Sequence, residues 1–210
     1  MATNTIRERY NLEQRLTTTK EWKSALAAAH QAATNHITQS NRANFVAVGG
    51  AALIFHGIDR PTDDLDMFGD EDTILEFAAG ALNDKRFRRD NFGVFYFDHL
   101  EDEDSFTVKI DFLQGGDVID SITSPKSFQG RFVASLQDLA IQKAIAYRDR
   151  STTKDLIDFS YIIATMDTQR ESFSAFEIDG ETREAMRNAA RASDARTKIV
   201  PALERVLSAR

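Results

Sequence analysis

The most constraining feature of this chain is the segment FVAVGGAALIFHGIDRPTDDLDMF, residues 45–68, in which the hydrophobic period changes twice. Its first part, Phe45 to Val48, is a short apolar run that ends at two glycines, which predicts a buried strand entering a tight turn. The next residues, Ala51 to Phe55, are helix formers with an apolar face. A strand, a glycine turn and a helix therefore follow one another, so the fold contains both a sheet and helices.

Gly49 and Gly50 stand where this strand passes into the helix. Because glycine has no Cβ, the backbone N–H groups of such a turn can approach an anion closely, and a helix dipole adds about half a positive charge there. A phosphate group would bind readily at this point. A glycine pair before a helix is more often a requirement of turn geometry, so this interpretation needs support from elsewhere in the chain.

Asp64 and Asp66 provide part of that support. Side chains alternate along a strand, so the two aspartates would project from one face while Leu65 and Met67 enter the core. Two carboxylates held on one face repel each other unless a cation neutralises them. Oxygen ligands alone favour a hard divalent ion, Mg²⁺ or Mn²⁺. The alternative is an aspartate-rich turn whose acids cap a helix or face solvent.

Asp111 is the third acidic residue, and it lies inside the predicted strand SFTVKIDFL, residues 105–113. A carboxylate in an apolar strand is costly to leave unpaired. A third metal ligand, or a general base that accepts the proton of an incoming hydroxyl, would explain its place. An ion pair with Lys109 on the same strand face, or exposure at a sheet edge, would explain it equally well.

These motifs occur together in an order that resembles the nucleotidyltransferase superfamily, which includes DNA polymerase beta. The VGG motif at residues 48–50 is followed by DLDM at residues 64–67 and by Asp111 on a later strand. The segment RPTDDLD, residues 60–66, is most similar to the AbiEii-type branch of minimal nucleotidyltransferases. Several members of that branch are toxins of toxin–antitoxin pairs.

The same branch carries a lysine on a helix after the sheet and a KDxxD element in the next helix. Here Lys143 and the sequence KDLID, residues 154–158, match. The resemblance covers residues 45–166. It implies an α+β nucleotidyltransferase fold, with a mixed sheet flanked by helices.

The resemblance also implies an enzyme of the EC 2.7.7 type, a metal-dependent transferase that moves a nucleoside monophosphate from a nucleoside triphosphate to a hydroxyl of tRNA, protein or a small molecule. The implied metal ligands and catalytic residues, for Mg²⁺ or Mn²⁺, are Asp64, Asp66 and Asp111. The implied nucleotide-binding residues are Gly49, Gly50, Thr62, Lys143 and Lys154. A toxin role and an antitoxin partner are implied with them.

One position departs from the family pattern. Many relatives have a serine directly after the glycine pair, whereas this chain has Ala51, so backbone amides would carry the phosphate contact with help from Thr62 or Arg60. This departure keeps a second function open: a catalytically silent module that binds a nucleotide or another protein on the same fold. From the residues alone, Lys143 could be a solvated helix lysine, and Lys154 and Asp158 could form a surface ion pair.

Composition restricts the setting of the protein. The chain has no cysteine, which excludes disulfides and thiolate zinc sites and suits a reducing cytoplasm. No apolar stretch approaches the length of a membrane span, and the N-terminus lacks the apolar core of a signal peptide, so we expect a soluble cytoplasmic protein with no membrane partner.

The net charge of −7 is unevenly distributed. Residues 1–44 hold six Lys and Arg against three Glu, and residues 183–210 hold seven against three acids. Both ends could therefore flank an acidic cleft and hold a polyanion such as tRNA, or they could be ordinary amphipathic helices with solvated arginines.

The periodicities predict the following layout. Strands are expected at residues 45–48, 64–68, 86–89, 92–98 and 105–113, with one further short strand at 128–133. Helices are expected within 12–40 and at 71–82, 135–148, 153–166 and 181–208, the last bent or broken at Pro201. The corresponding domains are an N-terminal helical segment (1–44), a nucleotidyltransferase core (45–134) and a C-terminal helical region (135–210).

Overall fold

The computed structural model describes residues 19–101, 104–113, 123–173 and 178–208. The chain divides into two compact units. The first comprises residues 1–115 and 125–133 and contains the sheet; the second comprises residues 116–124 and 134–210 and contains the C-terminal helices. The finer division into three domains, with boundaries after residues 44 and 134, stays a prediction.

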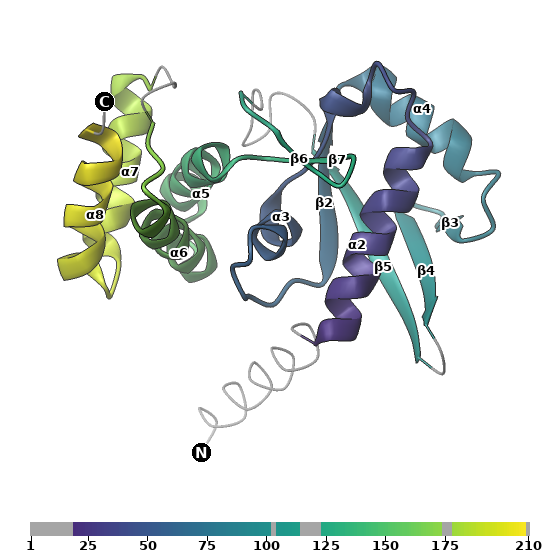
Figure 1. Cartoon of the computed structure of the whole chain (residues 1–210), viewed down its shortest axis with the longest axis horizontal. Helices are drawn as coiled ribbons and strands as arrows, with labels where there is room; N and C mark the ends of the chain where they lie inside the picture. Colours follow the sequence, from purple (N-terminus) through teal and green to yellow (C-terminus); the bar gives the residue numbers. More distant parts are fainter. Residues whose placement is uncertain (1–18, 102–103, 114–122, 174–177, 209–210) are drawn as a thin grey trace. The chain divides into compact units, whose positions relative to one another are not determined.

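The first unit is built on one seven-stranded mixed sheet (Figure 1). Its strands are β1 (Phe45–Ala47), β2 (Asp64–Gly69), β3 (Phe87–Arg89), β4 (Phe95–Glu101), β5 (Asp104–Leu113), β6 (Lys126–Phe128) and β7 (Arg131–Val133), in the spatial order β3-β4-β5-β2-β1-β7-β6. β2 is parallel to β5 and β1 is parallel to β7, whereas the other neighbours are antiparallel. The predicted α+β class is confirmed.

Among the described residues, three α-helices accompany this sheet: α2 (Lys20–Asn35), α3 (Gly49–Phe55) and α4 (Glu71–Ala81). Thr19 caps α2 by accepting the backbone N–H of Trp22 at 3.1 Å, and Asp70 caps α4 by accepting that of Thr73 at 2.8 Å. Such caps satisfy N–H groups that the first turn of a helix leaves unpaired. α2 packs on β2, β4 and β5, so the sheet is covered on the face where its apolar side chains lie.

The core of this unit is centred on Phe77 of α4. Its ring lies 5.0 to 5.7 Å, centroid to centroid, from four rings contributed by the strands: Phe45, Phe87, Phe95 and Phe112. Phe77 is fully buried. Aromatic pairs at these separations add to the free energy of burial, so this cluster ties α4 to strands from both halves of the sheet.

Two predicted strands differ in the structure. The single strand expected at residues 128–133 is a hairpin, β6 and β7, because Gln129 and Gly130 take positive φ angles of 51° and 80° and reverse the chain. The strand expected from residue 92 begins at Phe95, because Asp90 accepts the N–H groups of Phe92 and Val94 in a turn. Of the predicted N-terminal helix, residues 12–18 lie outside the described residues.

The second unit consists of α5 (Leu136–Arg150), α6 (Thr153–Gln169), α7 (Gly180–Ala192) and α8 (Arg196–Ser208). α5 begins with a capping box formed by Ser135 and Asp138. α5 packs on α6 and α7, and α8 packs on α6 and α7. The predicted helices at 135–148 and 153–166 are confirmed within a few residues at their ends.

The single C-terminal helix predicted at 181–208 is wrong, because the chain forms two helices that separate at Ser193. The backbone of Ser193 is extended, and its hydroxyl accepts the N–H of Ala195 at 3.2 Å and contacts the Ser160 hydroxyl at 2.8 Å. Pro201, where the break was expected, lies exposed within α8. There the carbonyl four residues earlier can be solvated, which makes the lost helix hydrogen bond tolerable.

Candidate active site

The glycine turn lies directly against three polar side chains. Gly49 has a φ of +60°, and a Cβ at this position would overlap the carboxylate of Asp66. A Cβ at Gly50 would lie 2.5 Å from both a guanidinium nitrogen of Arg60 and the hydroxyl oxygen of Thr62. Both positions therefore require glycine for space, and Gly49 requires it for backbone conformation as well.

Three carboxylates meet beside this turn. Asp64 and Asp66 project from one face of β2, where they are half-buried, while Leu65 and Met67 are fully buried on the other. Asp111 stands on β5, in register with Asp66 across the parallel pair. Ligand oxygens of the three aspartates lie within 4.8 Å of one another. The pairing of β2 with β5 thus joins residues that are far apart in the chain.

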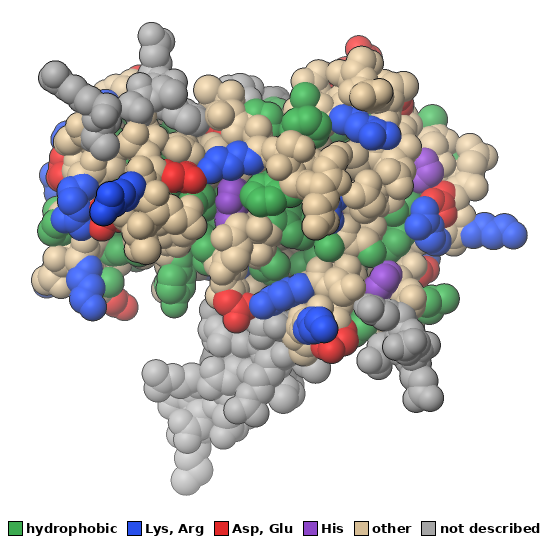
Figure 2. Space-filling model, in the orientation of Figure 1, with side chains coloured by type: hydrophobic (Ala, Val, Ile, Leu, Met, Phe, Trp, Pro, Cys, Tyr) green, Lys and Arg blue, Asp and Glu red, His purple; other side chains and the backbone are tan. Residues whose placement is uncertain are grey.

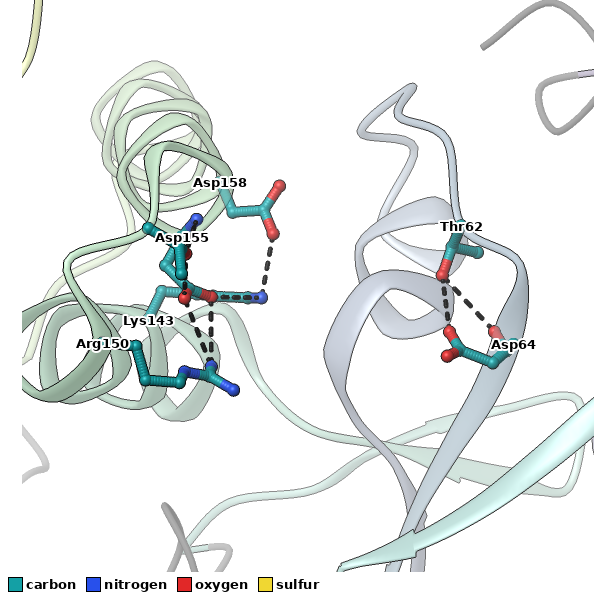
Figure 3. Close-up of polar contacts among 7 residues, drawn as sticks. Thr62, Asp64, Lys143, Arg150, Asp155 and Asp158 are labelled. Atoms are coloured by element: carbon teal, nitrogen blue, oxygen red, sulfur yellow. Dashed lines mark hydrogen bonds and ion pairs between the residues drawn. The ribbon is translucent and has the colours of Figure 1, made fainter. Parts of the chain in front are cut away.

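A hydrogen-bonded chain supports Asp64. The hydroxyl of Thr62 donates to Asp64 Oδ1 at 3.0 Å (Figure 3), and the carbonyl of Thr62 accepts the indole N–H of Trp22 at 2.8 Å. Trp22 is buried in α2. Sequence reasoning did not identify Trp22, since no local signal connects a residue of the N-terminal helix to a loop forty positions later.

Lys109 lies in the same cluster. It precedes Asp111 by two residues on β5, so both project from one face, and its ammonium donates to Asp111 Oδ2. The hydrogen bond that Lys109 donates to Asp111 is the main reason that the pKa of Lys109 is raised above its ordinary value, and the charge of Asp64 adds to it. The ion pair that was one sequence interpretation of Asp111 is therefore present together with the convergence of the three acids.

The donor set suits a hard divalent cation. It contains carboxylate oxygens only, on three residues close enough to share ligands. Lys109 already places one positive charge against Asp111, which shows that the cluster attracts a cation. The residues therefore fit a divalent metal, without distinguishing Mg²⁺ from Mn²⁺.

A second polar cluster lies within the helical unit. Lys143 of α5 forms ion pairs with Asp155 at 3.1 Å and with Asp158 at 2.9 Å, and Arg150 pairs with Asp155 at 3.2 Å (Figure 3). The side chains of Lys143, Asp155 and Asp158 are 12%, 5% and 3% exposed. The interpretation of Lys143 as a solvated lysine is therefore wrong.

The surroundings of Asp155 favour its charged form. Burial alone would raise the pKa of Asp155, but the hydroxyl of Thr152 and the charges of Lys143 and Arg150 outweigh it, so the pKa lies below its ordinary value. Lys154, also predicted to bind nucleotide, is exposed on α6. Both lysines belong to the second unit, and their role toward a nucleotide stays a prediction.

Arginines of the basic C-terminal segment, Arg187, Arg191 and Arg205 among them, form ion pairs with acidic side chains. Arg187 pairs with Glu204, and Arg205 pairs with Asp167, at 3.0 and 2.6 Å. On the face drawn in Figure 2, blue and red side chains are interspersed. These contacts favour the interpretation of α7 and α8 as amphipathic helices with paired arginines.

A family model described as "Nucleotidyl transferase AbiEii toxin, Type IV TA system" matches residues 36–206. The chain belongs to the AbiEii nucleotidyltransferase toxin family. The resemblance inferred from the VGG, DLDM and KDLID motifs is thereby confirmed, and the match extends over both units. A search of curated proteins finds no relative.

Solved structures place the AbiEii-family chain among nucleotidyltransferase folds. An antigenic nucleotidyltransferase-like protein from Paracoccidioides brasiliensis is 15% identical, with a TM-score of 0.61 over 90% of this chain and 95% of that one. The protein JHP933 from Helicobacter pylori is 14% identical, with a TM-score of 0.50 over 86% of this chain and 82% of that one. At these identities the likeness shows the fold. Among helices of the described residues, none is both long and apolar enough to cross a bilayer.

Proposed function

We propose that this chain transfers a nucleoside monophosphate from a nucleoside triphosphate to a hydroxyl acceptor, using Mg²⁺ or Mn²⁺ held by Asp64, Asp66 and Asp111. The observation that carries the proposal is the convergence of these three carboxylates within 4.8 Å, on two paired strands and beside a glycine turn. Membership of the AbiEii family supports the same reaction class.

The residues of the first unit have separate tasks in this reaction. Gly49 and Gly50 allow backbone N–H groups to approach the phosphates, and Arg60 adds a positive charge where its guanidinium lies against Gly50. Thr62 orients the carboxylate of Asp64 through its hydroxyl. Residues that hold a metal ligand in place in this way contribute to metal affinity.

The chemical step is an in-line displacement. The acceptor oxygen attacks the α-phosphorus, the bond to pyrophosphate breaks, and the hydroxyl proton leaves to a base or to water. A bound divalent cation supplies neutralisation of the phosphates and activation of the attacking hydroxyl. Asp111 lies where a carboxylate could serve as a ligand or accept that proton.

The second unit contributes Lys143 and Lys154 in this proposal, on the strength of the family motif. Asp155 and Asp158 hold the ammonium of Lys143 from two sides, which restricts the directions in which it can present its charge. Lys154 is exposed, so its charge carries no desolvation penalty. It could contact a phosphate as a point charge.

The acceptor proposed first is a tRNA hydroxyl, with a protein hydroxyl and a small molecule as the other candidates. The family description also supports a toxin role with an antitoxin as partner. Both the triphosphate and its metal are available in the cytoplasm, which is the compartment we propose.

A labelling experiment tests this function. The protein is incubated with each α-labelled nucleoside triphosphate, Mg²⁺ and total tRNA, or with protein acceptors. We expect label to transfer from one nucleotide, and Asp64→Ala to reduce transfer by more than about a hundredfold, because a metal ligand is lost. Asp63→Ala is the matched control, since Asp63 is an exposed neighbour on the same segment, and it should retain activity.

Ala51 supports the second candidate, a catalytically silent nucleotide-binding or protein-interaction module. Where many relatives carry a serine hydroxyl, this chain has a methyl group that is fully buried. Trp22 distinguishes the two, because it is the only tryptophan and its indole is bonded to the Thr62 loop. A fluorescence change with nucleotide but no transfer to any acceptor would select the silent nucleotide-binding module. The absence of both the fluorescence change and the transfer would contradict the transferase and the nucleotide-binding module alike.

A further inference from the structure

Lys109 forms an ion pair with Asp111, one of the three carboxylates of the acidic cluster of Asp64, Asp66 and Asp111. Where β5 pairs with β2, Lys109 of β5 lies opposite Asp64 of β2, and it precedes Asp111 on β5 by two residues. Its side chain is 41% exposed and that of Asp111 is 32% exposed. The ion pair therefore lies at the open side of the cluster, where a ligand could reach it.

The Lys109 ammonium would compete with a divalent cation for the carboxylate of Asp111. A divalent cation bound through the Asp111 oxygen that Lys109 contacts competes with that ammonium, because both are attracted to the same carboxylate and repel each other. With Lys109 in place, the three aspartates and the lysine carry a net charge of −2; without it they would carry −3. The lysine therefore reduces the attraction of the cluster for a cation before any substrate is bound.

We propose that Lys109 makes metal loading of the site depend on the nucleotide, an inference that rests on the proposed function. Before nucleotide binds, Lys109 serves as counter-ion to Asp111 and weakens binding of the divalent cation there. A nucleoside triphosphate brings several negative charges, so the displaced ammonium gains new phosphate partners while the metal gains phosphate oxygens. Because ion pairs this exposed are weak, the displacement is easy once those partners arrive.

Two consequences follow from this arrangement. The site discriminates against free divalent cations, so it does not hold a full metal complement in the absence of its substrate. By linkage, if bound triphosphate increases the affinity for the metal by a given factor, bound metal increases the affinity for the triphosphate by the same factor. Lys109 is thus a positioning and coupling residue of the proposed reaction.

The test measures Mn²⁺ binding to the full-length protein by electron paramagnetic resonance, with and without a non-hydrolysable nucleoside triphosphate. Without nucleotide, Lys109→Met should bind Mn²⁺ about tenfold or more tightly than the wild type, since one competing charge is lost. With nucleotide the two proteins should differ much less. Lys109→Arg keeps the charge and should resemble the wild type, as should Lys85→Met, which removes an exposed lysine outside the cluster.

The outcomes distinguish failure of the coupling role of Lys109 from failure of the proposed function. If Lys109→Met binds Mn²⁺ no more tightly than the wild type in the absence of nucleotide, the coupling role is overturned while the metal site stands. If the wild type binds no Mn²⁺ even with nucleotide, or Asp64→Asn binds it equally well, the proposed function fails and the coupling role with it. A purely structural lysine would change thermal stability without changing the ratio of the two Mn²⁺ affinities.

Discussion

The two units each contain a cluster of aspartates with a lysine, and the clusters differ in charge balance and burial. In the helical unit, Asp155 and Asp158 face Lys143 and Arg150, and the two carboxylates are nearly fully buried. In the sheet unit, three half-buried aspartates face Lys109, with the guanidinium of Arg60 at the adjacent turn. Carboxylates equal cations in the first case and exceed them in the second.

This difference is the one expected between a structural network and a site that could bind a cation. A buried cluster is stable only when its charges are matched, because an unpaired buried charge is very costly. A partly exposed cluster can hold more carboxylates than cations, since water solvates the remaining charge. The three carboxylates on β2 and β5 could therefore take up a divalent cation, as proposed above.

The largest stability effect should come from breaking the balanced network. Lys143→Met removes the buried cation that pairs with both Asp155 and Asp158, so we expect the free energy of unfolding to fall by about 3 kcal/mol, as when one partner of a buried pair is removed. Urea denaturation measures the change. Lys154→Met is the matched control, because this lysine is exposed in the first turn of α6, and it should change stability by less than about 0.5 kcal/mol. Equal effects of the two variants would contradict the comparison.

Lowering the pH should destabilise the two units over different pH ranges. His30 of α2 is fully buried, and burial, with the charge of Arg131, lowers its pKa to about 3 from 6.5. Between those values the unfolded chain binds a proton on His30 that the folded one does not. The sheet unit is therefore most stable above pH 6.5 and loses up to about 1.4 kcal/mol per pH unit below it.

The helical unit should respond later, because the pKa of Asp155 is lowered below its ordinary 3.8 and its contribution is lost only as pH falls past that value. Hydrogen exchange followed by mass spectrometry at pH 7, 5 and 4 should show protection falling first in α2 and the sheet. His30→Leu should abolish that early loss. Protection that falls first in α5 and α6 would reverse the expected order.

The smallest effect on stability should come from neutralising one acid of the cluster in the sheet unit. Asp64→Asn removes a carboxylate that its neighbours repel, while the amide oxygen can still accept the Thr62 hydroxyl, so we expect stability to stay unchanged or to rise by about 0.5 kcal/mol. Asp158→Asn should lower stability, because it removes a partner of buried Lys143. Thermal unfolding of the two variants measures both. A clear loss of stability in Asp64→Asn would place that residue in a structural network.

Local patterns predicted much of the first unit, and the errors have a common cause. The alternation in DLDM places Asp64 and Asp66 on one face, and the glycine pair predicts the turn that leads into α3, both as observed. The hairpin at residues 126–133 and the break at Ser193 were missed. Each depends on a short turn whose residues, Gln129 and Ser193, give weak local signals and act through backbone geometry or a side-chain contact made on folding.

The sequence by itself determined which residues could share a face of a strand, because side-chain alternation and glycine geometry are properties of a few neighbouring residues. Only the tertiary structure decided that Asp111 stands beside Asp66, since β2 and β5 are adjacent in space but separated by two strands in the chain. It also decided that Lys143 is buried among aspartates of the next helix. Strand pairing and helix packing join distant segments through the free energy of burying their shared apolar faces, and no local pattern records the resulting partners.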